Sequence, residues 1–133
     1  MKIAEWQEKV YALAKEKGWW DGIDPKDPGI IPEKIALIHS EASEALEVYR
    51  VPSDFSLGPP SRIYEDPDGE AWLSPKTEDG ALRKPVGFDS EMADIVIRVM
   101  DLCAHLGIDL ERAIREKHAY NETRPRRHGG KRC

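Results

Sequence analysis

Apolar side chains recur every three or four positions in four stretches of this chain, a period that predicts helices. The predicted helices span residues 2–17, 32–50, 89–106 and 110–124. Gly18 ends the first helix, and Pro32 suits the first turn of the second. Asp109 can cap the fourth helix, which Pro125 terminates. The pattern therefore predicts an all-α fold, a bundle of the four-helix type.

The third predicted helix differs from the others because apolar residues go nearly all the way round it. These residues are Ile95, Val96, Ile97, Val99, Met100, Leu102 and Cys103. A helix of this kind belongs in a protein core or at an interface between subunits. Three other helices and a polar loop do not cover it fully, so we expect a homo-oligomer, a dimer or a tetramer.

Residues 51–87 form a connection too long for a simple loop between two helices. Asp66-Pro67-Asp68-Gly69 predicts a turn, and Ile63-Tyr64 can pair with Trp72-Leu73 around it as a small hairpin. The sequence leaves open whether this segment covers a site as a lid or reaches a partner subunit as an arm.

Two pairs of acidic residues stand inside the second and third helices. Glu41 and Glu44 form the first pair, and Glu91 and Asp94 form the second. A spacing of three places both carboxylates of a pair on one helix face, roughly 5–6 Å apart at Cβ. If the two helices pack together, four carboxylates converge, and like charges in a partly dry site need a cation. Hard divalent cations prefer oxygen ligands, so the pattern predicts a magnesium site between helices.

Each pair also has a plainer structural interpretation. Glu41 and Glu44 can belong to a solvated acidic face, although neither has Lys or Arg three or four positions away. Glu91 can offset the macrodipole at the start of the third helix. Asp94 lies deeper in that helix, where Arg98 at i+4 can pair with it.

Three polar residues continue the apolar stripe of the fourth helix toward its end. Lys117, Asn121 and Arg124 follow Leu110, Ala113 and Ile114 along the same face. Their direction suits donors that reach phosphate oxygens, or a salt bridge that closes the bundle over the carboxylates. Trp19 and Trp20 likewise allow two interpretations: they cover the core, or they offer a flat face on which a base stacks.

Composition and charge limit the remaining classes. The 133 residues are 40% hydrophobic and 34% charged, which suits one soluble domain over residues 1–133. The net charge of the chain is −5. Residues 122–133 form a tail with a net charge of +4, so the other 121 residues carry −9. An acidic body of this kind argues against general binding of nucleic acid.

Location follows from what the chain lacks. No apolar run reaches the ~20 residues that span a bilayer, and the start of the chain has no signal-peptide pattern. Cys103 and Cys133 form neither a disulfide framework nor a zinc site. We therefore expect a cytoplasmic protein with no membrane partner.

The acidic segments resemble those of a known enzyme family. Residues 38–47, with Glu41-x-x-Glu44, and residues 91–98, with Glu91-x-x-Asp94, are similar to the paired motifs of MazG-like nucleoside triphosphate pyrophosphohydrolases. The run Lys117-x-x-x-Asn121-x-x-Arg124-Pro125 resembles the carboxy-terminal segment of their small single-domain members. The resemblance implies an all-α bundle completed by oligomerisation and Mg²⁺-dependent hydrolysis of (d)NTP to (d)NMP and pyrophosphate, with Mn²⁺ as a substitute.

The resemblance also implies roles for individual residues. Glu41, Glu44, Glu91 and Asp94 would hold Mg²⁺ and take part in catalysis, with Glu41 or Glu44 as general base. Lys117, Asn121 and Arg124 would bind the triphosphate. Two alternatives remain open: a phosphoribosyl-ATP pyrophosphohydrolase, and a helical bundle that binds metal or nucleotide without catalysis. A P-loop NTPase is excluded because its phosphate-binding motif does not occur.

Overall fold

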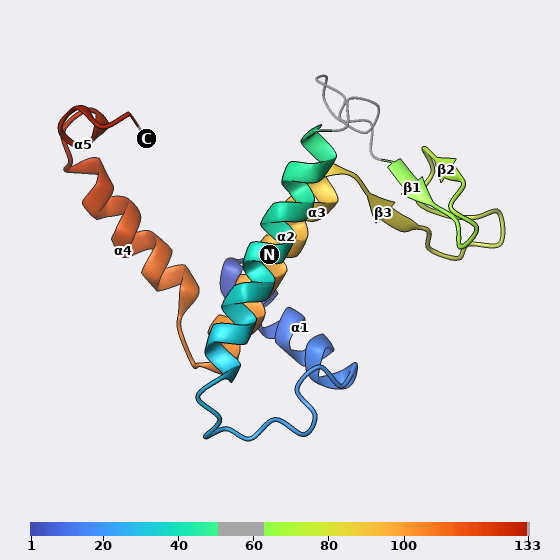
Figure 1. The fold of residues 1–133 in the computed structure, drawn as a ribbon, viewed down its shortest axis with the longest axis horizontal. Coiled ribbons are helices and arrows are strands. Elements are labelled where there is room, and N and C mark those ends of the chain that lie inside the picture. The colour runs from blue at the N-terminus through green and yellow to red at the C-terminus, as the bar shows by residue number, and fades with distance from the viewer. Residues whose placement is uncertain (51–62, 133) are drawn as a thin grey trace. The chain divides into compact units, whose positions relative to one another are not determined.

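The computed structural model describes residues 1–50 and 63–132, and it is mostly helical, as predicted. The helices are α1 (Ile3–Glu16), α2 (Ile30–Arg50), α3 (Phe88–His105), α4 (Leu110–Glu122) and the short α5 (Arg127–Gly130) (Figure 1). The four long helices begin and end within two residues of the predicted bounds. The expectations for residues 51–62 and for Cys133 lie outside the described residues.

The predicted helix ends have a clear physical basis. The Asp109 side chain accepts a hydrogen bond from the Arg112 backbone N–H at 2.9 Å, which confirms it as the cap of α4. Gly18 follows α1 with a φ of 81°, a conformation that residues with a Cβ rarely adopt. A Cβ at Gly18 would also lie 2.9 Å from the Asp21 carboxylate, which would have to move, so this backbone conformation favours glycine.

The chain divides into two compact units, which are described separately. The first unit comprises Met1–Gly22 with Met100–Cys133, and the second comprises Ile23–Val99. Helix α3 therefore contributes its first turns to the second unit and its last turns to the first unit.

Polar side chains hold the first unit together. The buried Gln7 amide donates to the Ile108 carbonyl at 2.6 Å and accepts from the Leu110 N–H at 3.4 Å, so α1 holds the turn before α4. The Trp20 ring stacks on His105 with centroids 3.9 Å apart, and its indole N–H donates to Asp101 at 2.9 Å. Trp20 thus packs against α3, whereas Trp19 is exposed.

A small antiparallel sheet accounts for the described part of the connection between α2 and α3. Its strands are β1 (Ile63–Glu65), β2 (Ala71–Trp72) and β3 (Lys84–Val86), in the order β2-β1-β3. Tyr64 pairs with Trp72 in β2, which confirms the predicted hairpin. The third strand, which pairs with β1 on its other edge, was not predicted from the sequence.

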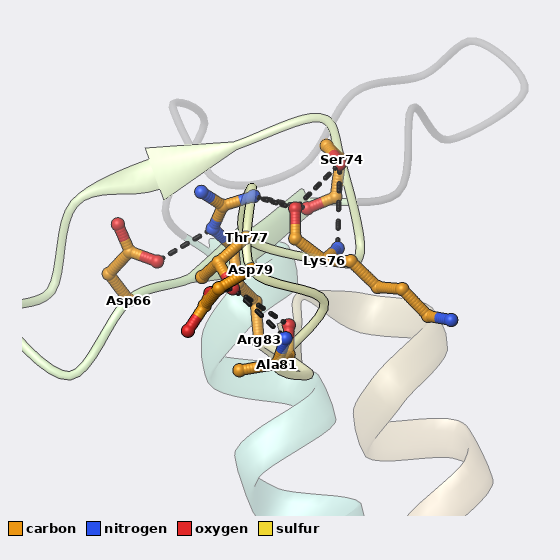
Figure 2. Close-up of polar contacts among 7 residues, drawn as sticks. All are labelled: Asp66, Ser74, Lys76, Thr77, Asp79, Ala81 and Arg83. Carbon is orange, nitrogen blue, oxygen red and sulfur yellow. Dashed lines mark hydrogen bonds and ion pairs between the residues drawn. The ribbon is translucent and has the colours of Figure 1, made fainter.

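Arg83 organises the loops of this sheet (Figure 2). Its side chain is 8% exposed, and its Nε donates to the Asp66 carboxylate at 2.6 Å. Its Nη1 donates to the backbone carbonyls of Ser74 and Lys76, and the guanidinium lies over the Trp72 ring at 4.3 Å. A guanidinium has five donors in a fixed fork, so this one side chain joins the turn at Asp66 to the segment from Ser74 to Lys76.

Burial among the described residues is limited, which agrees with the expectation that the other helices do not fully cover α3. Among the described residues, those buried as whole residues are Gln7, Glu41, Ala45 and Leu102. On α3, Met92, Val96 and Ile97 are exposed, and α4 has no buried residue. The described residues therefore leave part of the apolar surface of α3 exposed. The helices of the described ranges do not have the length and apolar character needed to cross a membrane.

Candidate functional site

Three acidic side chains of the second unit come together between α2 and α3. Glu41 of α2 and Glu91 and Asp94 of α3 each offer a carboxylate oxygen, and these oxygens lie within 4.8 Å of one another. Glu41 is 8% exposed, and the other two are half-buried. We call Glu41, Glu91 and Asp94 the acid cluster. The sequence prediction that carboxylates of these two helices converge is thus met by three of the four.

Glu44, the fourth predicted residue, lies beside the acid cluster rather than within it. Its side chain is exposed and lies close enough to Glu91 to raise the pKa of that carboxyl. Glu44 is therefore a neighbour of Glu91 at the margin of the cluster.

The contacts also give the direction of the two helices. Position 41 of α2 faces position 98 of α3, while position 44 faces position 91. Residue numbers rise along one helix as they fall along the other, so α2 runs antiparallel to this part of α3. An antiparallel pair places two motifs with a spacing of three opposite each other over about one turn.

Burial and like charge disfavour ionisation in the cluster. Burial raises the pKa of the Glu91 carboxyl, and the negative charge and hydrogen bond of Glu44 raise it further. Burial likewise raises the pKa of Asp94, and the charge of Glu41 adds to this effect. Arg98 and Lys84 oppose the shift at Asp94. The cluster therefore resists holding its full negative charge unless a cation is close.

The sequence predicted an ion pair of Arg98 with Asp94, whereas the structure pairs Arg98 with Glu41. The Arg98 Nε donates to Glu41 Oε1 at 2.5 Å, from α3 across to α2. The spacing of four had indicated a pair with Asp94 on its own helix, and Arg98 does stabilise the charge of Asp94. The contact with Glu41 depends on the distance between two helices, which the sequence alone does not contain.

The donor set fits a hard divalent cation. Oxygen atoms on opposite sides of an octahedral Mg²⁺ lie about 4.2 Å apart, twice the usual bond length of about 2.1 Å. Neighbouring oxygen ligands of the same ion lie about 3 Å apart. The cluster oxygens lie within 4.8 Å of one another, so they must move closer together to share one ion. Carboxylate is also the ligand type that Mg²⁺ prefers, with water completing its shell. These residues therefore fit Mg²⁺, and Mn²⁺ has similar requirements.

The predicted phosphate-binding residues lie in the first unit. Lys117 and Asn121 are exposed on α4, and Arg124 follows the end of that helix and is half-buried. The Lys117 Nζ lies 5.6 Å from the centre of the Tyr120 ring. All three side chains carry donors suited to phosphate, and their assignment to a site shared with the acid cluster stays a prediction.

Comparison of the chain with protein-family models, with curated proteins and with solved structures finds no match. The assignment of a function therefore depends on the geometry and the chemistry of the cluster.

The raised pKa values predict how the stability of the metal-free protein changes with pH. A carboxyl whose pKa is higher in the folded state contributes stability below its unfolded pKa, and loses it as pH rises through the folded value. In the presence of EDTA, the parent should therefore gain stability from Glu91 and Asp94 as pH falls from 7 toward about 4. Thermal melts of the parent and of the double variant E91Q/D94N measure this contribution.

The matched control for these melts is Glu47→Gln, which removes an exposed acid of α2 outside the cluster. It should keep the parent's dependence on pH, whereas the double variant should show a smaller gain on acidification. If the melting temperatures of the parent and of the double variant change equally with pH, the surroundings of Glu91 and Asp94 do not disfavour their ionised forms.

Proposed function

We propose that this protein is a Mg²⁺-dependent nucleoside triphosphate pyrophosphohydrolase, which converts an NTP or dNTP to the monophosphate and pyrophosphate. The observation that carries the proposal is the acid cluster, in which carboxylates from two helices converge although burial and repulsion raise the pKa of two of them. Such an arrangement is costly to the fold and is typical of a functional site. The motif resemblance of both helices supports the same reaction.

In the proposed step, a water oxygen attacks the α-phosphorus of the triphosphate. A bond forms between this oxygen and the α-phosphorus, while the bond from the α-phosphorus to the αβ-bridging oxygen breaks and pyrophosphate leaves. Bound Mg²⁺ would supply neutralisation of the phosphate charge and alignment of the reactants. The proton of the water passes to a carboxylate, for which we propose Glu44, because Glu44 lies beside Glu91 but outside the three side chains that would hold the metal.

The proposal assigns the phosphate groups to Lys117, Asn121 and Arg124. A chain whose residues 1–121 carry a net charge of −9 would repel a triphosphate unless cations lie close to the bound phosphates. The exposed Lys117 ammonium and the Arg124 guanidinium are suitable for this role.

The proposal also includes a homo-oligomer, a dimer or a tetramer. Large apolar side chains are exposed on both helices that carry the acid cluster. They include Ile31, Ile35, Leu46, Tyr49, Met92, Val96 and Ile97. Apolar side chains at this density are more typical of an interface than of a solvated surface.

The products of the reaction test the central proposal. With Mg²⁺ and a panel of NTPs and dNTPs, phosphorus NMR should show pyrophosphate and a monophosphate, and in ¹⁸O-water the label should enter the monophosphate. Asp94→Asn should lower kcat at least about a hundredfold because it removes a proposed metal ligand. Glu47→Gln, on the exposed side of α2, should retain the parent's rate.

Other products would contradict the proposal in different ways. Orthophosphate with a diphosphate would mean attack at the γ-phosphorus. Turnover of phosphoribosyl-ATP alone would support the alternative substrate. Tight Mg²⁺ binding without any turnover would support a binding protein.

Lys117→Ala tests the assignment of the phosphates. Removal of the ammonium group should raise KM for the nucleotide about tenfold or more, since a charge-assisted hydrogen bond contributes on the order of 1.5–3 kcal/mol. Helix content by circular dichroism and Mg²⁺ affinity by calorimetry should stay at the parent's values, because Lys117 is exposed and lies outside the acid cluster. A loss of folding would instead identify Lys117 as a structural residue.

Light scattering tests the assembly. We expect a molar mass of two or four chains at micromolar concentration, with at least about 1,000 Å² buried in total. Val96→Glu places a charge among exposed apolar residues of α3 and should shift the protein toward the monomer. Lys9→Glu, an exposed change on α1, is the control and should leave the mass unchanged. A parent that is monomeric under these conditions would contradict this part of the proposal.

A further inference from the structure

We propose that Arg98 is the internal counter-ion of the acid cluster, and that it competes with the divalent cation for Glu41. The inference rests on the proposed function, because it concerns the regulation of the metal site assigned there. Binding of Mg²⁺ and pairing of Arg98 with Glu41 would then be antagonistic, and Arg98 would set the metal affinity of the protein.

The contact itself is the first observation. Arg98 Nε donates to Glu41 Oε1 at 2.5 Å, and the Glu41 side chain is only 10% exposed. A carboxylate with so little access to water needs a positive partner, because removal of a charge from water costs several kcal/mol. In the metal-free protein this partner is the guanidinium of Arg98. The same carboxylate supplies one of the cluster oxygens that fit a cation.

The second observation is that Arg98 acts on more than one member of the cluster. It lies one turn after Asp94 on α3, and its positive charge favours the ionised form of that carboxyl. One guanidinium thus partly neutralises two of the three acidic side chains. A dication at the cluster would take over both interactions.

Electrostatic repulsion opposes the presence of both cations at once, that is, of a bound metal ion and of Arg98 paired with Glu41. A cation that contacts Glu41 and Asp94 would lie within a few ångströms of the guanidinium, and like charges at such a distance in a partly buried site repel each other strongly. Arg98 must therefore move away from Glu41 when the metal binds, or the metal binds less tightly. The Arg98 side chain is 38% exposed, so it has access to solvent when Glu41 is taken by the metal.

A different role for Arg98 makes the opposite prediction. If Arg98 only orients Glu41 for the metal, as partners of metal ligands commonly do, its removal should weaken binding about 10–100-fold. If Arg98 competes, its removal should strengthen binding. The sign of the change in affinity therefore separates the two roles.

The experiment compares the parent with Arg98→Gln and with Lys84→Gln. Lys84 is a matched control because its charge also favours the ionised form of Asp94. Unlike Arg98, it is exposed, and the described contacts include no ion pair between Lys84 and the cluster. Dissociation constants for Mg²⁺ and Mn²⁺ are measured by calorimetry, without nucleotide. Thermal melts are recorded in EDTA and in Mg²⁺ at constant ionic strength.

We expect a crossed result for Arg98→Gln. In EDTA it should melt below the parent, because the buried Glu41 loses its partner. It should bind Mg²⁺ about tenfold more tightly, since one repelling charge is gone. Its melting temperature should therefore rise more with Mg²⁺ than that of the parent. Lys84→Gln should change the affinity by less than about threefold, because an exposed charge is screened.

The outcomes separate this inference from the proposed function. If the parent binds Mg²⁺ and Arg98→Gln binds it equally or more weakly, Arg98 is not a competitor and the metal site still stands. If neither protein binds Mg²⁺ or Mn²⁺, the metal site and the proposed function both fail. Arg98→Met keeps the apolar part of the side chain and replaces Arg98→Gln if that variant does not fold.

Discussion

The repulsion among the carboxylates between α2 and α3 is the constraint on which the rest of the site depends. Glu91 and Asp94 have raised pKa values because burial and neighbouring negative charges disfavour their ionised forms. The fold does not relieve this repulsion by moving the side chains into water. It places the Arg98 guanidinium against the most buried of them, Glu41. In the proposed function a divalent cation binds here, and the relative affinities of this cation and of Arg98 then decide which of them contacts Glu41.

Helix α3 connects this site with the rest of the protein. Its first turns carry Glu91, Asp94 and Arg98, and its last turns carry Asp101 and His105, on which Trp20 packs. Polar contacts rather than a large apolar core hold these elements in place, since few side chains of the described chain are buried. Large apolar side chains on α2 and α3 are exposed among the described residues, and the proposed oligomer would cover them.

The proposed reaction combines two requirements that oppose each other in an acidic protein. Acidic ligands are needed to hold Mg²⁺, while the triphosphate is repelled by the same charges. In the proposal, carboxylates on α2 and α3 hold the metal, and cationic donors on and after α4 bind the phosphates. In the absence of matching families or structures, this argument depends on the chemistry of the donors.

The sequence by itself determined the helices, because their apolar period, Gly18 and the Asp109 cap act within a few residues of the chain. It also determined which face of α2 carries Glu41, and it placed the hairpin around the turn at residues 66–69. Such features are local, so neighbouring residues are enough to predict them.

Only the tertiary structure decided which charges meet. Arg98 pairs with Glu41, which is 57 positions away, rather than only with Asp94 on its own helix. Glu44 lies beside Glu91 and outside the group of three. The antiparallel alignment and the separation of two helices determine these contacts. Neither quantity is encoded in the spacing of residues along one helix, because it depends on how the side chains of both helices pack.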